Sequence, residues 1–110
     1  MLRRRNEESE SHIQARCSQL YAALGGKVFW LSQRRPSGQT PGLPDLIVVF
    51  PGKAVIFHET KRPGGKPSAE QAELRQWLAG TAVTHVLGGY TEACQALEEL
   101  GLVASLGLRA

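Results

Sequence analysis

The chain has 110 residues, the size of one domain that buries about two thirds of its unfolded surface. Its 42% apolar and 21% charged residues are typical of a globular protein, and its net charge of +3 permits a polyanionic partner without requiring one. No apolar run is long enough to cross a membrane, and the first eleven residues lack the hydrophobic core of a signal peptide, so we expect a cytoplasmic protein with no membrane partner.

The N-terminal region divides into a basic arm and the start of the domain. We expect residues 1–8 to form a flexible arm and residues 9–110 to fold as a single domain. Ser9 or Ser11 can cap a first helix that runs to about Leu24, where a pair of glycines ends it.

This first helix carries an apolar stripe, and Glu10 lies on the same side. The stripe consists of Ile13, Cys17, Leu20 and Leu24. A carboxylate on an inward face needs a partner. Two interpretations of Glu10 therefore stay open: a third carboxylate at a metal site, or a first-turn residue that favours the helix dipole and stays in water.

A strand and a loop follow the first helix. The strand is predicted from Lys27 to Gln33, because β-branched and aromatic residues are concentrated there. Residues 34–42 contain two prolines, two glycines and the pair Arg34 and Arg35. Loops of this composition carry function when they border a site, so we expect this one to order on nucleic acid, although a plain connector would have the same composition.

The centre of the chain predicts a β-hairpin that brings two carboxylates together. Its strands are Leu46–Phe50 and Ala54–Thr60, with a turn at 51–53. Asp45 opens the first strand and Glu59 closes the second, so antiparallel pairing places them side by side. Adjacent unpaired carboxylates repel each other and raise each other's pKa unless a cation lies between them.

A hard divalent cation with oxygen ligands, Mg²⁺ or Mn²⁺, is the natural occupant of such a pair. Lys61 follows directly and adds a fixed positive charge. This charge can orient a water molecule and stabilise charge that develops on a phosphate.

The C-terminal part predicts a helix, a strand and a helix. Ser68 and Gln71 have the spacing of a capping box, which gives Gln71 a structural explanation. The helix ends at Gly80, and we expect its apolar face to be part of the core; that face consists of Leu74, Trp77 and Leu78. A buried strand follows at 82–87, and Thr91 caps a last helix that runs to Leu100.

The predicted order is helix, three strands, helix, strand, helix. It indicates an α/β fold with one mixed sheet flanked by helices, in which the first three strands are antiparallel and the fourth joins by a helical crossover.

The cysteines and histidines do not indicate another site. Cys17 and Cys94 lie far apart without a Cys-x-x-Cys spacing, which argues against zinc. We expect no catalytic histidine, because none pairs with a serine or cysteine in the pattern of a nucleophile relay; the three are His12, His58 and His85.

Three segments resemble the VRR-Nuc branch of the PD-(D/E)XK nuclease superfamily, and the resemblance spans roughly residues 10–90. They are Gly42–Val49, His58–Lys66 and Ser68–Gln71. A Pro-Asp followed by Glu-x-Lys is weak by itself, but the glycine before it, the spacing, the Arg-Pro-Gly-Gly turn and the glutamine are specific together. The resemblance implies a restriction-endonuclease-like αβββαβα core.

The resemblance also implies roles for individual residues. Asp45, Glu59, the main-chain carbonyl of Thr60 and, from the first helix, Glu10 would bind the metal. Lys61 would be the catalytic lysine, and Gln71 would support the water or metal shell. Thr60 stands where many relatives have an apolar residue; this departure matters little, because the family uses only the carbonyl.

The implied function is a metal-dependent DNA endonuclease. Small stand-alone members resemble Holliday junction resolvases, so we expect a homodimer that cuts four-way DNA junctions, without a small-molecule cofactor, in a prokaryote or phage. Phosphate contacts would come from Arg34, Arg35, Arg62 and Lys66. Two alternatives stay open: a nuclease for flaps, nicked or plain duplex DNA, and a non-catalytic DNA-binding module with the same fold.

Overall fold

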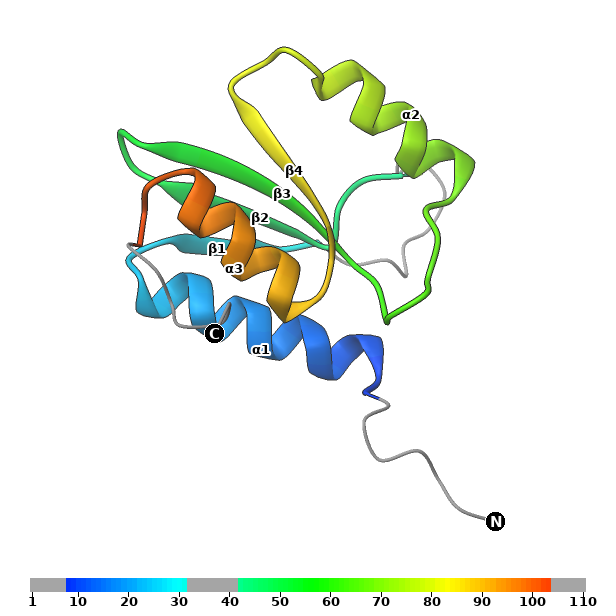
Figure 1. Cartoon of the computed structure of the whole chain (residues 1–110), viewed down its shortest axis with the longest axis horizontal. Coiled ribbons are helices and arrows are strands. Elements are labelled where there is room, and N and C mark those ends of the chain that lie inside the picture. The colour runs from blue at the N-terminus through cyan, green and yellow to red at the C-terminus, as the bar shows by residue number, and fades with distance from the viewer. Residues whose placement is uncertain (1–7, 32–41, 104–110) are drawn as a thin grey trace.

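The computed structural model describes residues 8–31 and 42–103 of the chain (Figure 1). The expectations for residues 1–7, for Arg34 and Arg35, and for residues 104–110 lie outside these ranges. No helix within the described ranges has both the length and the apolar character needed to cross a membrane.

The elements follow the predicted order. They are α1 (Glu10–Ala23), β1 (Lys27–Trp30), β2 (Leu46–Phe50), β3 (Ala54–Thr60), α2 (Ala69–Leu78), β4 (Val83–Gly88) and α3 (Tyr90–Glu99). The first strand ends at Trp30, earlier than expected. Thr91 does not cap α3, because Gly89 is the N-cap residue and its N–H donates to Glu92 Oε1 at 2.8 Å.

The four strands form one mixed sheet in the order β1-β2-β3-β4. Strands β1, β2 and β3 pair antiparallel, and β4 pairs parallel to β3 after the crossover through α2. Both the α/β class and the mixed sheet predicted from the sequence are therefore confirmed.

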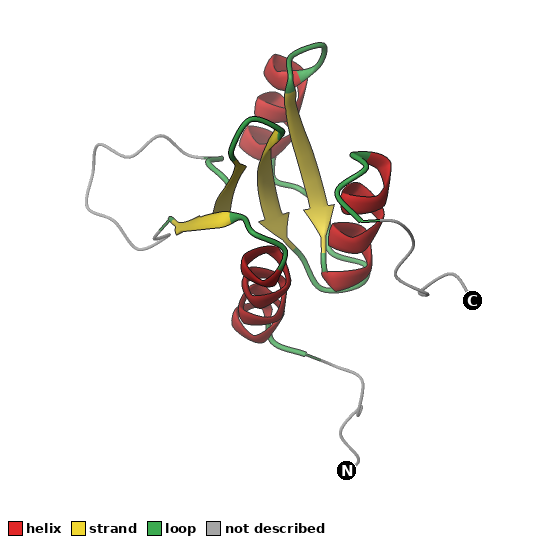
Figure 2. Ribbon diagram, turned by 90° about the vertical axis from the view of Figure 1, so that its left-hand side faces the viewer, coloured by secondary structure: helices red, strands yellow, loops and turns green. Residues whose placement is uncertain are grey.

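One face of the sheet is covered by α1 and α3 and holds the core. Strand residues of this face are buried against both helices, and α1 and α3 also contact each other. In both views α2 lies at the opposite end of the molecule from α1 (Figures 1 and 2). The core cluster of buried residues consists of Ile13, Cys17, Tyr21, Leu46, Val48, Phe50, Ile56, Val86, Ala93, Ala96 and Leu97.

The other face is more open. The strand register aligns Phe29, Ile47, Phe57 and His85 in one row across it. Phe29 is 47% exposed, and α2 contacts the sheet mainly at β4 and buries none of its own residues. The expectation that Trp77 is part of the core is wrong: it is 75% exposed, because the apolar side of α2 has too little sheet beneath it.

Helix α1 begins as predicted and packs with a shifted stripe. Ser9 is its N-cap residue, and the N–H of His12 donates to Ser9 Oγ at 3.1 Å. Tyr21 is fully buried, whereas Leu24 follows the helix as its C-cap residue and is 36% exposed. The buried face therefore passes through Tyr21 and leaves Leu24 at the rim.

Candidate metal and nucleic-acid site

The hairpin of β2 and β3 brings Asp45 and Glu59 together, as its spacing predicts. Leu46 pairs with His58 in the antiparallel register, so the positions one step further are Asp45 and Glu59. The Asp45 N–H donates to the His58 carbonyl at 3.1 Å, which fixes this end of the hairpin. The two carboxyl groups are close enough to share a hydrogen bond.

Thr60 holds Asp45 in place. Its main-chain N–H and its hydroxyl both donate to Asp45 Oδ2, at 2.8 and 2.6 Å. Charge-assisted hydrogen bonds of this kind are stronger than neutral ones. Asp45 is 6% exposed and Thr60 1%, so the pair is rigid and nearly dry. The threonine side chain therefore has a structural role at this position, in addition to the metal-binding role that the resemblance implies for its carbonyl.

Glu59 is the member of the pair whose negative charge is poorly stabilised. It is 2% exposed, and its Oε2 atom has no hydrogen-bond partner in the described part of the chain. Burial, then the charge of Asp45 and the hydrogen bond to it, raise the pKa of Glu59 to about 8 from 4.5; Lys61 opposes this shift. The protein by itself thus disfavours a charge at Glu59 at neutral pH.

A divalent cation fits this arrangement. It would satisfy the unpartnered Oε2 atom and offset both the burial and the repulsion by Asp45 that raise the pKa of Glu59. The donors are oxygens, which Mg²⁺ and Mn²⁺ prefer. Within the described ranges, no group of three acidic, histidine or cysteine side chains is placed to hold a metal. Main-chain carbonyls, water or phosphate oxygens would therefore have to complete the coordination.

Glu10 lies at the edge of this site. It is the first residue of α1 and it is exposed, so its expected place on the buried face is wrong. The reason is that the first turn extends beyond the layer that covers Ile13. Its charge nevertheless makes a small contribution to the raised pKa of Glu59, so the two residues lie in the same region of the molecule. A role as a third metal ligand stays a prediction.

Lys61 directly follows β3, and its main chain is anchored to β4. The Lys61 N–H donates to the Gly88 carbonyl at 3.1 Å. That carbonyl also accepts from His58 Nε2 at 3.0 Å, so Nδ1 of the same ring accepts from the Tyr21 hydroxyl at 2.7 Å. Burial lowers the pKa of His58, in agreement with a neutral ring.

This chain of hydrogen bonds from Tyr21 through His58 to Gly88 joins α1 to the main chain of the expected catalytic lysine. His58 is fully buried, as expected for a residue that packs in the interior. The role of Tyr21 was missed from the sequence. Its spacing of four from Cys17 and eight from Ile13 was the available signal.

Gln71 forms the capping box that its spacing predicts. The Gln71 N–H donates to Ser68 Oγ at 3.1 Å, and its Oε1 accepts from the Ser68 N–H at 2.9 Å. These contacts orient the side chain along the start of α2. The implied support of a metal shell stays a prediction.

Gly42 fixes the path of the chain into Asp45. Its φ is +88°, and a Cβ there would lie 2.7 Å from the main chain of Glu70 at the start of α2. Only glycine allows both this left-handed conformation and this close approach. Gly42 thus lets the segment that leads into Asp45 pack closely against the start of α2.

The cationic side chains near the pair are open to solvent. Arg62 and Lys66 are exposed in the turn after β3, and Lys61 is half-buried. This placement leaves Arg62 and Lys66 accessible to a phosphate backbone.

Comparisons with known proteins give one informative result. No family model matches the sequence, and a search of curated proteins finds no match. A solved structure described as a "VRR_NUC domain" superposes with a TM-score of 0.63 at 29% sequence identity. The alignment covers 82% of this chain and 94% of the other. The similarity therefore extends over almost the whole of that domain and includes sequence as well as fold.

Proposed function

Because this chain is a VRR-Nuc domain, we propose that it is a metal-dependent endonuclease that hydrolyses phosphodiester bonds in DNA. The observation that carries the proposal is the buried pair of Asp45 and Glu59 with an orphaned carboxylate oxygen, next to Lys61. A non-catalytic DNA-binding module has no need of a pair whose burial disfavours its own charge.

Each residue has a chemical role in this proposal. Asp45, Glu59 and the Thr60 carbonyl would hold Mg²⁺ or Mn²⁺ with water or phosphate oxygens, and Glu10 would act from α1 only if its side chain moves towards the pair. The bound ion supplies a water of lowered pKa and neutralises phosphate charge. The Lys61 ammonium would contact the reacting phosphate and stabilise the charge that develops on it. Tyr21 and His58 would position the main chain of Lys61 through the Gly88 carbonyl.

We further propose a four-way junction as the substrate and a homodimer as the active form. A domain of this size needs a second copy to cut two strands of a junction symmetrically. Large aromatic side chains, which are enriched at protein–protein interfaces, are exposed on this domain and support a dimer. They are Phe29, Trp30 and Trp77, exposed by 47, 54 and 75%. Selection by shape would depend on phosphate contacts from Arg62 and Lys66 together with Arg34 and Arg35.

A panel of substrates tests the proposal. Labelled four-way junction, flap, nicked duplex, plain duplex and single-stranded DNA are incubated with Mg²⁺ at one salt concentration. Lys61→Ala is compared with Lys53→Ala, a matched control in the exposed turn between β2 and β3. We expect cutting of the junction by the wild type and the control, with a rate about 10² to 10³ lower for Lys61→Ala.

Other results would redirect the proposal. Preferential cutting of flaps or duplexes would retain the nuclease and replace the substrate. Binding without cutting, equal for the wild type and Lys61→Ala, would favour a DNA-holding module. A protein that stays monomeric at high micromolar concentration, alone and on junction DNA, would contradict the junction proposal.

A further inference from the structure

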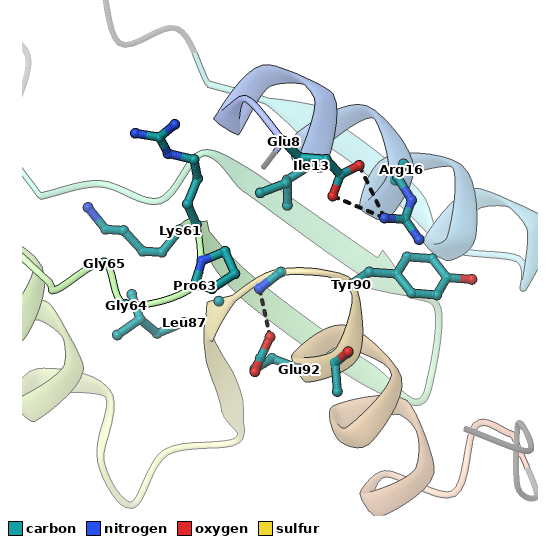
Figure 3. Close-up of a pocket in the computed structure, with 14 residues that line it drawn as sticks. Glu8, Ile13, Arg16, Lys61, Pro63, Gly64, Gly65, Leu87, Tyr90 and Glu92 are labelled. Atoms are coloured by element: carbon teal, nitrogen blue, oxygen red, sulfur yellow. Dashed lines mark hydrogen bonds and ion pairs between the residues drawn. The ribbon is translucent and has the colours of Figure 1, made fainter. Parts of the chain in front are cut away.

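A pocket lined by charged side chains lies near the carboxylate pair. It has a volume of about 450 Å³ and lies between α1, the turn after β3 and the start of α3 (Figure 3). Lys61 lines this pocket and also lowers the pKa of Glu59, so it belongs to both places. The other charged or aromatic residues that line it are Glu8, Arg16, Arg62, Tyr90 and Glu92.

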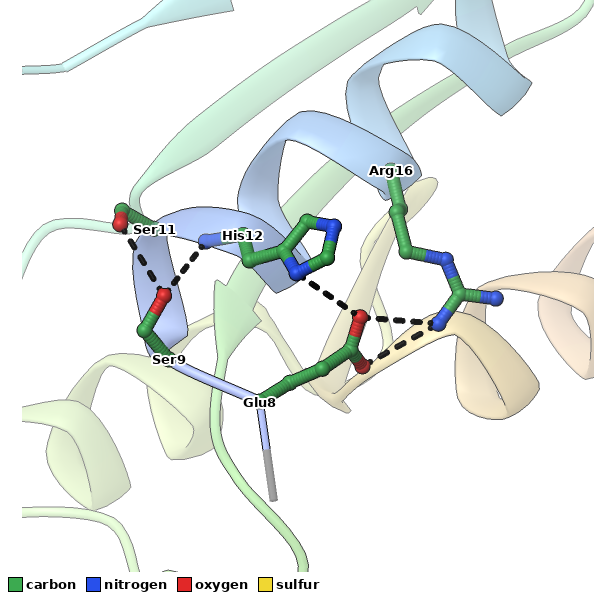
Figure 4. A network of polar contacts seen from close by, with 5 residues as sticks. All are labelled: Glu8, Ser9, Ser11, His12 and Arg16. Atoms are coloured by element: carbon green, nitrogen blue, oxygen red, sulfur yellow. Dashed lines mark hydrogen bonds and ion pairs between the residues drawn. The ribbon is translucent and has the colours of Figure 1, made fainter. Parts of the chain in front are cut away.

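The side chain of Arg16 is held in a defined position in this pocket. Its guanidinium carbon lies 4.5 Å from the centre of the Tyr90 ring, which holds the side chain by a cation–π contact. Nη1 donates to both carboxylate oxygens of Glu8, at 3.1 and 3.2 Å (Figure 4). The pocket thus already binds an anionic group, supplied by the chain itself.

The carboxylate of Glu8 is easily displaced. Glu8 precedes the N-cap residue of α1 and is not part of the helix, and its second contact is with His12, 3.3 Å away. The side chains of Arg16 and His12 are 43% and 62% exposed. Ion pairs this exposed contribute at most about 1 kcal/mol. A phosphate offers the same fork-shaped acceptor to arginine and can use more than one of its nitrogens.

We propose that this pocket is a second binding point for the DNA backbone, in which a phosphate takes the place of Glu8 on Arg16. The proposal depends on DNA as the substrate of the neighbouring carboxylate site. Lys61, which would contact the reacting phosphate, also lines this pocket, so the pocket adjoins the scissile position.

Charge balance favours this occupant. The pocket contains three cations, Arg16, Lys61 and Arg62, and two carboxylates, Glu8 and Glu92. Glu92 is held by the Gly89 N–H, whereas Glu8 belongs to no helix or strand. When Glu8 leaves, the pocket keeps three positive charges against one negative charge. Glu8 thus competes with an incoming phosphate for Arg16.

The experiment measures binding of the full chain to a fluorescent four-way junction and a duplex in EDTA, at several salt concentrations. We expect Arg16→Ala to weaken binding about tenfold at low salt and to reduce the salt slope by about 0.9, the value for one lost phosphate contact. Arg16→Lys keeps the positive charge but loses the forked geometry of the guanidinium, so its affinity for DNA should lie between those of the wild type and Arg16→Ala. Glu8→Gln should bind several times more tightly than the wild type.

Two control variants match these changes away from the pocket. Arg75→Ala removes an exposed arginine of α2, and Glu99→Gln neutralises an exposed glutamate at the end of α3. Both should bind DNA like the wild type. Circular dichroism of each variant confirms that the fold is kept.

The outcomes separate this inference from the proposed nuclease. If the wild type cuts DNA and Lys61→Ala does not, but Arg16→Ala binds as the wild type does, the pocket inference is wrong and the nuclease stands. Weaker binding by Glu8→Gln would also overturn the inference. If no DNA is cut but the Arg16 and Glu8 variants shift binding in opposite directions, the pocket stands without the nuclease. Absence of DNA binding by the wild type would refute both.

Discussion

Substitution of Glu59 by glutamine should stabilise the metal-free protein at alkaline pH. The folded state raises the pKa of this buried carboxyl from 4.5 to about 8, so between these values the folded state binds the proton that the unfolded state releases. Stability therefore falls as the pH rises through this window. Glu59→Gln removes the titrating group and with it this loss.

The size of the effect follows from the shift. One pKa unit corresponds to about 1.36 kcal/mol, so between pH 5 and pH 9 the wild type should lose about 4 kcal/mol relative to Glu59→Gln. Other titrating groups are common to both proteins and cancel in the comparison. Urea unfolding in EDTA at both pH values measures this difference between the two proteins.

Mg²⁺ or Mn²⁺ provides the second half of the test. The ion should restore wild-type stability at pH 9, because it binds the ionised carboxylate, and should have a smaller effect on Glu59→Gln. A free-energy difference that is the same at pH 5 and pH 9 would refute the account of Glu59 as a buried acid strained by Asp45.

Three further predictions concern the residues around the pair. Tyr21→Phe should lower stability by about 1–3 kcal/mol in thermal or urea unfolding, because buried His58 loses its hydroxyl donor; an unchanged stability would contradict that hydrogen bond. Ser68→Ala should cost about 1 kcal/mol through loss of the helix cap and should leave DNA cutting intact, whereas Gln71→Ala tests the metal-shell role by any additional loss of rate. Gly42→Ala should destabilise the fold by more than about 1 kcal/mol, since it combines a positive φ with a main-chain clash; a neutral result in unfolding would contradict the close contact with α2.

Local patterns in the sequence were sufficient to predict the hairpin and the placement of its two carboxylates side by side. The spacing between Asp45 and Glu59, with a turn between two apolar runs, determines which residues are opposite each other. The capping box at Ser68 and the N-cap at Ser9 likewise depend on neighbours within a few residues. Each of these features depends only on residues within a short segment of the sequence, and the structure confirms them.

Features that depend on packing between distant segments were not predictable in this way. The shift of the α1 stripe to Tyr21 follows from its hydrogen bond with His58, 37 positions away. Trp77 has the spacing of a core residue, but only the narrow contact between α2 and β4 shows that it is exposed. The contact of Arg16 with Tyr90 joins residues from opposite ends of the domain, and no pattern along the chain connects them.

The most direct test of the nuclease is the rate of cleavage of a labelled four-way junction by wild type and Asp45→Asn, with Mg²⁺, Mn²⁺ or EDTA. Asparagine can still accept the two hydrogen bonds from Thr60, so the variant should keep the fold while it loses the charge. We predict cutting by the wild type with either ion, none in EDTA, and a loss of at least about 10² in rate for Asp45→Asn. Cutting that is equally fast in EDTA, or unchanged in Asp45→Asn, would contradict the assignment of this site.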